Sequence, residues 1–309
     1  MRVSVVLCTY TLEMYGHFIE AAESIRGQTY DDLELVVVVD GSREVYERVE
    51  DEYGDVKEII LHMNDTNLGL LSSRNVGAEL ASGDVVAFID DDSIADEQWI
   101  AELVRTYEET GAIAAGGKIV GDWVAGKPTF LPEEYYWLVG VTYRGFTDQP
   151  GEVRNTFGSN ISFRRDVFLD LGGFDTDIGG RKGDANLQGG ETELCARLWE
   201  RKGRGVMYNP EALVHHKVFE WRIRKRWLAE RAFWQGYSKA TISQVLSGRS
   251  SKEESDFLYQ LIVYGFPKRL RVLVLGQNGA TARQLIALVL LTAFVGAGYL
   301  YGTLKARLN

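Results

Sequence analysis

The chain has 309 residues, of which 45% are hydrophobic, 11% aromatic and 25% charged. This composition excludes disordered, collagen-like and disulfide-rich proteins, and the length is enough for about two domains. The net charge of −10 argues against a general nucleic-acid-binding protein. Residues 1–213 carry a net charge of −20 and residues 214–309 one of +10. This uneven distribution of charge predicts two surfaces, one acidic and one basic, that contact different partners.

The beginning of the chain has the features of a strand in a cytoplasmic protein. The first apolar run, Val3–Cys8, is too short for the apolar region of a signal peptide. The two cysteines, Cys8 and Cys195, are too few for a disulfide framework. We therefore expect a reducing compartment.

Short apolar runs alternate with helical patterns along the first 120 residues. The predicted strands are Val3–Cys8, Leu33–Asp40, Glu58–Met63, Val85–Asp90 and Ile113–Lys118. The predicted helices are Tyr15–Gln28, Ser42–Glu52, Leu70–Ala81 and Glu97–Thr110. Because several strands are too uniformly apolar to have one solvated face, the alternation predicts an α/β fold with a mostly parallel central sheet and flanking helices. Ligands of such sheets bind beyond the carboxyl ends of the strands.

The pattern breaks between residues 121 and 150, where aromatic residues crowd a segment that holds three of the five prolines. This segment is interpreted either as core or as a substrate contact. A strand near Gly158–Arg164 follows, and then a glycine-rich stretch, Gly172–Gly190. A helix is expected from about Glu191 to Arg201.

The C-terminal region contains a run of 20 uncharged residues, Leu285–Leu304, between Arg283 and Lys305. That length is enough to cross about 30 Å of hydrocarbon. The alternatives are a buried core helix and a helix that lies in the membrane interface. Basic residues before this run, at 217–231 and 268–271, favour an anionic cytoplasmic leaflet. We expect the chain at the cell membrane, with its catalytic domain on the cytoplasmic side.

Three consecutive carboxylates, Asp90, Asp91 and Asp92, end one of the predicted buried strands. Such groups repel one another unless a cation compensates them, and their oxygens suit Mg²⁺ or Mn²⁺ bound to a diphosphate. A solvated acidic turn that caps the next helix is the alternative. Asp40 ends another strand, where an acidic residue can accept hydrogen bonds from a base or a ribose.

Six motifs occur together in the order and spacing of family 2 glycosyltransferases, which the chain resembles over roughly residues 1–240. They are Val3–Tyr10, Val39–Ser42, Asn67–Gly69 with Arg74–Asn75, Gly83–Asp92, Gly158–Asn160 and Gly172–Asp175. The resemblance implies a GT-A fold, a nucleotide-sugar donor, a divalent metal and inversion at the anomeric carbon.

The resemblance also implies roles for individual residues. The nucleotide pocket would be lined by Thr9, Tyr10, Asp40, Arg74, Asp90 and Asp91. The metal would be bound by Asp92 and by His216, which follows the strand-like Ala212–Val214. Outside this resemblance, a histidine on a strand is more often a core residue than a ligand.

The catalytic base is expected at the start of the helix after the glycine-rich stretch. Family members usually carry a Glu-Asp pair there with the aspartate as base, and Glu191 stands here at the position of that aspartate. A glutamate can equally deprotonate an acceptor hydroxyl. Glu193 is the competing candidate, and an acidic residue favoured by the helix dipole is the structural alternative.

Several stretches resemble archaeal enzymes that add glucuronate to glucosyl-dolichyl phosphate during protein N-glycosylation. They are Asp122–Pro128, Gly140–Phe146 and Arg231–Lys239. This resemblance implies UDP-glucuronate as donor and a lipid-linked saccharide as acceptor. The acceptor side would be formed by Gly158, Ser159, Asn160, Glu193 and Trp234. An arginine would recognise the uronate carboxylate. The candidates are Arg144, Arg154, Arg164 and Arg181.

The expected organisation is a catalytic domain over residues 1–240, with a nucleotide-binding half (1–120) and an acceptor half (121–240). An amphipathic region (241–284) and a membrane helix (285–304) follow it. One alternative function is transfer of glucose, mannose or N-acetylglucosamine directly onto dolichyl phosphate or another lipid-linked acceptor. Nucleotidyl transfer and a non-catalytic membrane-tethered subunit of a glycan assembly complex are the others.

Overall fold

The fold is described from a computed structural model, and the residues it describes are 1–182, 185–245, 259, 261–274 and 279–308. The chain forms two compact units. The first contains Met1–Val120, Asp148–Gly180 and Gly190–Lys217, and the second contains Gly121–Thr147, Arg181–Gly189 and Val218–Asn309. Each is described by itself below.

The first unit begins with four parallel strands in the order β3-β2-β1-β4. They are β1 (Val3–Thr9), β2 (Leu33–Asp40), β3 (Ile59–Asn64) and β4 (Val85–Asp90). The helices that follow them are α1 (Tyr15–Arg26), α2 (Arg43–Tyr53), α3 (Leu70–Leu80) and α4 (Trp99–Thr110). All eight elements lie within two residues of their predicted bounds. Uniformly apolar strands such as β1 are buried on both faces, as helix-covered parallel strands require.

The second half of this sheet is antiparallel. It is formed by β5 (Ser93–Ala95), β6 (Ala114–Trp123), β7 (Gly151–Val153), β8 (Ile161–Arg164) and β11 (Val206–Val218). β8 pairs antiparallel with both β4 and β6, and β11 pairs antiparallel with β5 and β7. The predicted α/β fold is confirmed; the first four strands are parallel, and the pairings of β5, β7 and β8 described here are antiparallel.

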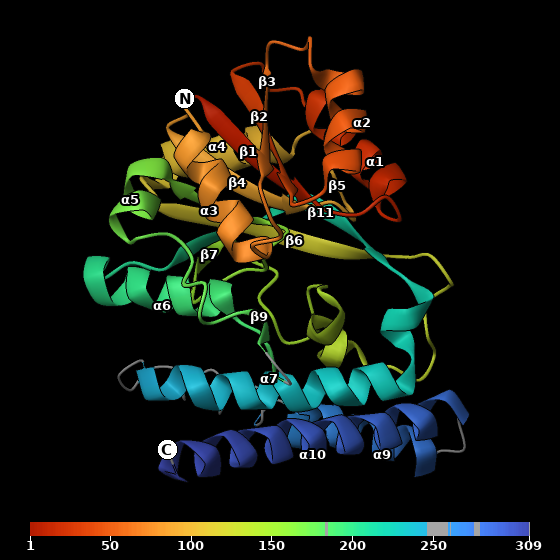
Figure 1. Ribbon diagram of the computed structural model, residues 1–309. Helices are drawn as coiled ribbons and strands as arrows, with labels where there is room; N and C mark the ends of the chain where they lie inside the picture. The colour runs from red at the N-terminus through yellow and green to blue at the C-terminus, as the bar shows by residue number, and fades with distance from the viewer. Residues whose placement is uncertain (183–184, 246–258, 260, 275–278, 309) are drawn as a thin grey trace. The chain divides into compact units, whose positions relative to one another are not determined.

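Helices cover both faces of the sheet (Figure 1). Side chains of α1, α2 and α4, among them Phe18, Val49 and Leu103, form one apolar layer. Side chains of α3, α5 (Arg165–Asp170) and α6 (Gly190–Lys202) form the layer on the opposite face. The unit is therefore a three-layer α/β arrangement.

The second unit consists mainly of helices around the aromatic segment. Its described elements include η1 (Glu133–Val139), η2 (Glu220–Ile223), α7 (Lys225–Val245), the π-helical turn η3 (Leu261–Gly265), α9 (Phe266–Val274) and α10 (Gly279–Leu308). The short strands β9 (Gly180–Lys182) and β10 (Ala185–Leu187) pair with each other. Tyr135 and Leu138 of η1 are buried in one core with Leu228 of α7 and Leu288 of α10. The burial of η1 supports the interpretation of residues 121–150 as core rather than as a substrate contact.

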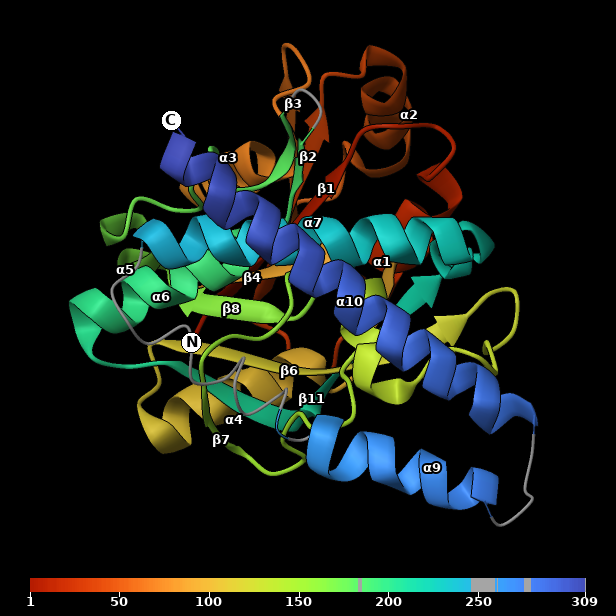
Figure 2. The ribbon, with the colours of Figure 1, turned by 90° about the horizontal axis from the view of Figure 1, so that it is seen from below.

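Helix α10 is long and apolar enough to cross a membrane, and it packs against α7 along one side (Figure 2). Glycines make this close approach possible. A Cβ atom at Gly298 would lie 1.9 Å from the Phe233 carbonyl oxygen, and one at Gly236 would lie 1.9 Å from the Val295 carbonyl oxygen. The two backbones are therefore in contact, as in helix pairs that associate through small residues. Part of the predicted region 241–284 lies outside the described residues.

Replacing Gly298 by alanine is expected to lower the melting temperature of the detergent-solubilised chain, because the new methyl group meets the α7 backbone, which cannot move aside. Gly296 is the matched control, since a Cβ there meets nothing within 4 Å. Gly296→Ala should leave the melting temperature unchanged or raise it, because alanine favours a helix by about 1 kcal/mol over glycine. Circular dichroism melting of both variants tests this contact. Equal melting temperatures would contradict it.

Candidate active site

The carboxyl ends of the parallel strands bring several predicted nucleotide-binding residues to one edge of the sheet. Cys8 of β1 lies beside Asp90 at the end of β4. Thr9 lies beside Val39, the residue before Asp40. The Thr9 side chain is buried, and its hydroxyl oxygen has no hydrogen-bond partner among the described residues.

Two further predicted residues, Tyr10 and Asp91, directly follow β1 and β4. Tyr10 is 58% exposed, and Asp91 is partly exposed. Both positions are thus open to a ligand at the edge where such sheets bind their substrates.

Asp40 shapes the neighbouring loop. Its Oδ1 accepts a hydrogen bond from the backbone N–H of Leu68, and its Oδ2 accepts one from that of Gly69, both at 2.8 Å. Gly41 has φ of +73°, and a Cβ there would lie 2.2 Å from the backbone nitrogen of Asn67. The Asp-Gly sequence therefore allows the loop to close over the end of β2, and Asp40 is a buried framework residue in this structure.

Arg74 of α3 connects the acidic residues of the site. Its Nη2 donates to Asp90 Oδ1 at 2.5 Å and to the Gly158 carbonyl oxygen at 3.0 Å. Its Nη1 donates to Glu191 Oε1 at 2.9 Å. One guanidinium group thus fixes the end of β4 and the start of α6 in a single geometry.

Arg74, predicted for the nucleotide pocket, is deeply buried. The residue is 1% exposed, and its guanidinium carbon lies 5.9 Å from the Phe88 ring centre and 5.6 Å from that of Phe174. Burial alone would lower the pKa of Arg74, but Asp90 and Glu191 outweigh it and raise the pKa. Arg74 is therefore a permanently charged residue that positions Asp90 and Glu191.

The two candidate bases differ in accessibility. Glu193 is buried, and Arg197 donates to its two carboxylate oxygens at 2.5 and 2.6 Å. Arg197 also donates to the backbone of the glycine-rich turn, at the Gly173 carbonyl oxygen. Glu191 keeps 23% of its side chain exposed. Glu193 is therefore a structural ion-pair residue, which corrects its predicted place on the acceptor side, and Glu191 is the accessible carboxylate.

Asp92 and His216 lie together, as a shared metal would require. Antiparallel pairing of β11 with β5 sets His216 beside Ser93, the residue after Asp92. His216 Nε2 lies 3.4 Å from Asp92 Oδ1, and each side chain is 4% exposed. A carboxylate and an imidazole are a reasonable donor pair for a divalent cation. Across the residues that the structure describes, no group of three or more His, Cys, Asp and Glu side chains converges on one point.

Lys217 is a site residue that sequence reasoning missed. Its backbone N–H donates to the Asp92 carbonyl oxygen at 2.8 Å. Its buried side chain donates to Glu20 Oε2 at 2.6 Å and lies 3.0 Å from His17 Nδ1. The hydrogen bond from Lys217 lowers the pKa of Glu20. The available signal was a lysine directly after two histidines and the apolar run Ala212–Val214.

The residues predicted for the acceptor side have different surroundings. Ser159 is buried and donates to Asp90 Oδ2. Gly158 leaves room for the ion pair, because a Cβ there would lie 2.2 Å from Glu191 Oε1. Both residues therefore help to hold the carboxylates at the edge of the sheet.

Asn160 belongs to the sheet and not to the acceptor side, which corrects its prediction. Its side chain is fully buried. Its Oδ1 accepts from Trp99 Nε1 at 2.9 Å and from the Gly117 N–H at 3.1 Å. Its Nδ2 donates to the carbonyl oxygens of Lys118 and Ala212. These four bonds join β6, β11 and α4, and they leave no hydrogen-bonding group of Asn160 for a ligand.

Trp234, also predicted for the acceptor side, lies in α7 of the second unit. Its partly exposed ring packs against Phe233 and Tyr237, with ring centres 5.3 and 5.4 Å apart. Within that unit it is part of an aromatic row along α7.

Of the four candidate arginines, Arg154 is the one whose charge acts on Cys195 together with that of Glu191. Burial raises the pKa of Cys195, Glu191 raises it further, and Arg154 acts in the opposite direction. Glu191 and Arg154 therefore both lie near this thiol. Arg164 pairs with Val85, at the amino end of β4 and away from Asp90. Arg144 belongs to the second unit, and the side chain of Arg181 lies outside the described residues.

Comparisons with known proteins agree with this geometry. The family model described as "Glycosyl transferase family 2" matches residues 4–172. A glucosyl-dolichyl phosphate glucuronosyltransferase of Haloferax volcanii is 51% identical over 309 residues, and the match covers 100% of this chain and 98% of the relative. The succinoglycan biosynthesis protein ExoM of Rhizobium meliloti is 26% identical, with 76% of this chain and 73% of the relative covered.

Solved structures share the fold. The mannosyltransferase PcManGT from Pyrobaculum calidifontis, in complex with GDP-Man and Mn²⁺, matches with a TM-score of 0.59 at 17% identity, over 99% of this chain and 87% of that one. TarS 1-349 of S. aureus, in complex with UDP-GlcNAc, matches with a TM-score of 0.56 at 15% identity, over 99% and 92% of the two chains. At these identities the two likenesses show a shared fold.

Proposed function

The chain belongs to glycosyltransferase family 2, and on that premise we propose that it transfers glucuronate from UDP-glucuronate to a dolichyl-phosphate-linked monosaccharide. The observation that carries the proposal is the 51% identity, over the whole length of both chains, to a glucosyl-dolichyl phosphate glucuronosyltransferase. The accessible carboxylate and the Asp–His pair at one sheet edge are the groups that such a transfer needs.

We assign the metal site to Asp92 and His216. Their buried carboxylate and imidazole fit Mn²⁺ better than Mg²⁺, because Mg²⁺ prefers oxygen ligands alone. When bound there, the cation would neutralise the negative charge of the departing diphosphate. Lys217 helps to position Asp92, because its backbone N–H donates a hydrogen bond to the Asp92 carbonyl oxygen.

Glu191 is the proposed general base. It accepts the proton of the acceptor hydroxyl while that oxygen forms a bond with the anomeric carbon of the donor sugar. The bond between the anomeric carbon and the diphosphate oxygen breaks on the opposite side, so that UDP leaves and the configuration inverts. Arg74 keeps the carboxylate oriented through the 2.9 Å hydrogen bond to Oε1.

Arg154 is the arginine that we assign to the uronate carboxylate. Its partly exposed side chain belongs to the same unit as Glu191, and it acts on the same thiol, Cys195, that Glu191 also affects. A guanidinium group recognises a carboxylate through two parallel hydrogen bonds, which a neutral hydroxymethyl group does not accept with equal strength.

We further propose that the protein works at the cell membrane, with the first unit in the cytoplasm. Exposed cations of α9 and α10, including Lys268, Arg271 and Arg283, surround the start of the apolar helix. Cationic residues next to such a helix favour the cytoplasmic side. The first unit would then carry the donor site, and the second would carry the helices that meet the membrane.

A transfer assay with a panel of donors tests this function. The detergent-solubilised full chain is incubated with Mn²⁺ and glucosyl-dolichyl phosphate, and with radiolabelled UDP-glucuronate, UDP-glucose, UDP-N-acetylglucosamine or GDP-mannose. We expect label in the lipid fraction from UDP-glucuronate alone. Efficient transfer from another donor would overturn the choice of sugar. Parallel reactions contain dolichyl phosphate in place of its glucosylated form. Transfer to dolichyl phosphate alone would overturn the choice of acceptor.

The same assay tests Arg154. Arg154→Gln is expected to raise KM for UDP-glucuronate about tenfold or more, because a charge-assisted bidentate pair is lost. Binding of UDP alone should be unchanged. Arg164→Gln is the matched control. The Arg164 side chain donates to the Ala112 carbonyl oxygen, at the end of β8 that lies away from Asp90. An unchanged KM in Arg154→Gln would contradict this assignment.

A further inference from the structure

The second unit contains a cavity of about 570 Å³ that the proposed reaction does not use. It is bounded by the segment that leads into η1, by α9 and by the first turn of α10. Every lining residue belongs to this one unit. The cavity is therefore a feature of the helical unit itself.

Positive charge dominates the lining. Lys127, Arg144, Lys268 and Arg269 all line the cavity, whereas Glu133 is the one acidic residue among the lining side chains. Glu133 forms ion pairs with both Lys127, at 3.5 Å, and Arg144. Lys268 has no carboxylate partner within the described part of the chain. The cavity thus keeps a surplus of positive charge that an anion would neutralise.

The cavity is held in shape by a buried ion pair. Arg269 Nη1 and Nη2 donate to the two carboxylate oxygens of Glu134 at 2.8 and 2.7 Å, and both side chains are 8% exposed. Arg269 Nη1 also donates to the Gly265 carbonyl oxygen at 3.0 Å. These bonds fix α9 on η1, so the cations of the cavity are attached to a rigid base.

Helix α10, which begins at this cavity, exposes apolar side chains on its other side. Leu131 and Val272 line the interior of the cavity beside the cations. Outside it, the exposed residues of α10 are largely apolar, for example Ile286 at 60%, Leu290 at 52% and Leu300 at 64%. The cavity thus suits an anionic headgroup, and the exposed face of α10 suits the hydrocarbon layer of a membrane.

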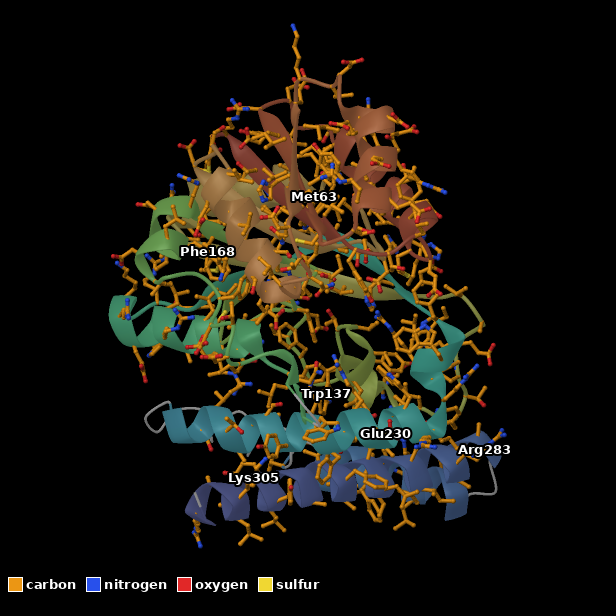
Figure 3. All side chains as sticks on the ribbon, in the orientation of Figure 1. Met63, Trp137, Phe168, Glu230, Arg283 and Lys305 are labelled. Carbon is orange, nitrogen blue, oxygen red and sulfur yellow. The ribbon has the colours of Figure 1, made fainter. Side chains whose placement is uncertain are left out.

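Figure 3 shows how this polarity is arranged along the helix. Arg283 lies near the end of α10 where the cavity is, and Lys305 lies near the opposite end. The apolar residues lie between these cations. Such an arrangement suits a helix that contacts the hydrocarbon and headgroup layers of a bilayer.

We propose that this cavity binds the phosphate group of an anionic membrane phospholipid. Lys268 and Arg144 contact the phosphate oxygens, and the acyl chains extend into the hydrocarbon layer that the exposed apolar residues of α10 contact. The inference does not depend on which sugar is transferred, because it concerns binding of bulk lipid by the second unit.

Binding of short-chain lipids to the full chain in neutral detergent tests the proposal. Isothermal titration calorimetry compares dioctanoyl phosphatidylglycerol, dioctanoyl phosphatidylcholine and inorganic phosphate. We expect phosphatidylglycerol to bind at least tenfold more tightly than phosphatidylcholine. The double variant Lys268→Gln/Arg144→Gln should bind it about 30-fold more weakly, which is five- to sixfold for each cation removed.

The control variant removes two cations at the other end of the same helix, Lys305→Gln/Arg307→Gln. Its affinity for phosphatidylglycerol should equal that of the unsubstituted chain. Equal losses in both double variants would overturn the proposal, because they would show a general effect of net charge. Lys268→Gln alone changes an exposed side chain, so it gives a fivefold loss even where the double variant fails to fold. Inorganic phosphate that competes at the same concentration as the lipid would identify a site for soluble anions and would overturn the lipid assignment.

Discussion

Replacing Asp92 by asparagine is expected to lower kcat by about 10²- to 10⁴-fold, which corresponds to several kcal/mol of lost charge stabilisation in the transition state. The asparagine amide keeps the shape of the buried side chain, but it is a weaker ligand for a metal cation than the carboxylate. The backbone bond from Lys217 to the Asp92 carbonyl oxygen is unaffected. Initial rates of transfer at saturating UDP-glucuronate measure the effect.

Two further measurements separate loss of metal from loss of fold. The melting temperature of Asp92→Asn without added metal should match that of the unsubstituted chain, whereas the stabilisation by Mn²⁺ should disappear. Asp96→Asn is the matched control, because it makes the same change outside the proposed metal site. Asp96 Oδ1 accepts a hydrogen bond from the Gln98 N–H at the start of α4. Full turnover in Asp92→Asn would remove this residue from the metal site.

Glu191→Gln is expected to lower kcat by about 10²- to 10⁴-fold, because an amide does not accept the proton of the acceptor hydroxyl. The affinity for UDP should be nearly unchanged. The amide oxygen of the new side chain can still accept a hydrogen bond from Arg74, and Asp90 continues to neutralise that guanidinium group. Single-turnover kinetics with preformed donor complex separates the chemical step from binding.

Glu193→Gln is the matched control, since it makes the same change two residues away. Its expected effect is on stability, with a loss of about 3 kcal/mol in the free energy of unfolding, because the partly buried Arg197 loses its charge partner. Below its melting temperature, this variant should keep most of its turnover. The reverse pattern, with turnover lost in Glu193→Gln and kept in Glu191→Gln, would exchange the roles of the two residues.

The sequence was sufficient to predict the parallel half of the sheet and its helices. Apolar runs such as Leu33–Asp40 are uniform because both faces are covered, and that pattern is visible without a structure. The three-residue strands β5 and β7 were not predicted, because so short a segment has no detectable periodicity. The pairing of β5 with β11 is nevertheless what brings His216 to Asp92.

The identity of the candidate site residues was more predictable than their surroundings. Carboxylates after buried strands pointed to Asp90 and Asp92. The buried positions of Arg74 and Asn160 depend on partners 16 to 117 and 42 to 61 positions away, respectively, and no local pattern predicts such contacts. The pairing of Glu193 with Arg197 spans one helical turn and was a signal that the sequence did contain.

Mass spectrometry of the lipid product tests the central claim most directly. The full chain, Glu191→Gln and Glu193→Gln are each incubated with UDP-glucuronate, glucosyl-dolichyl phosphate and Mn²⁺, and the extracted lipid is analysed. We predict one added hexuronate with the full chain and with Glu193→Gln, and almost none with Glu191→Gln or after removal of the metal by a chelator. An unmodified lipid with the full chain, under conditions where UDP binds, would contradict the proposed transfer.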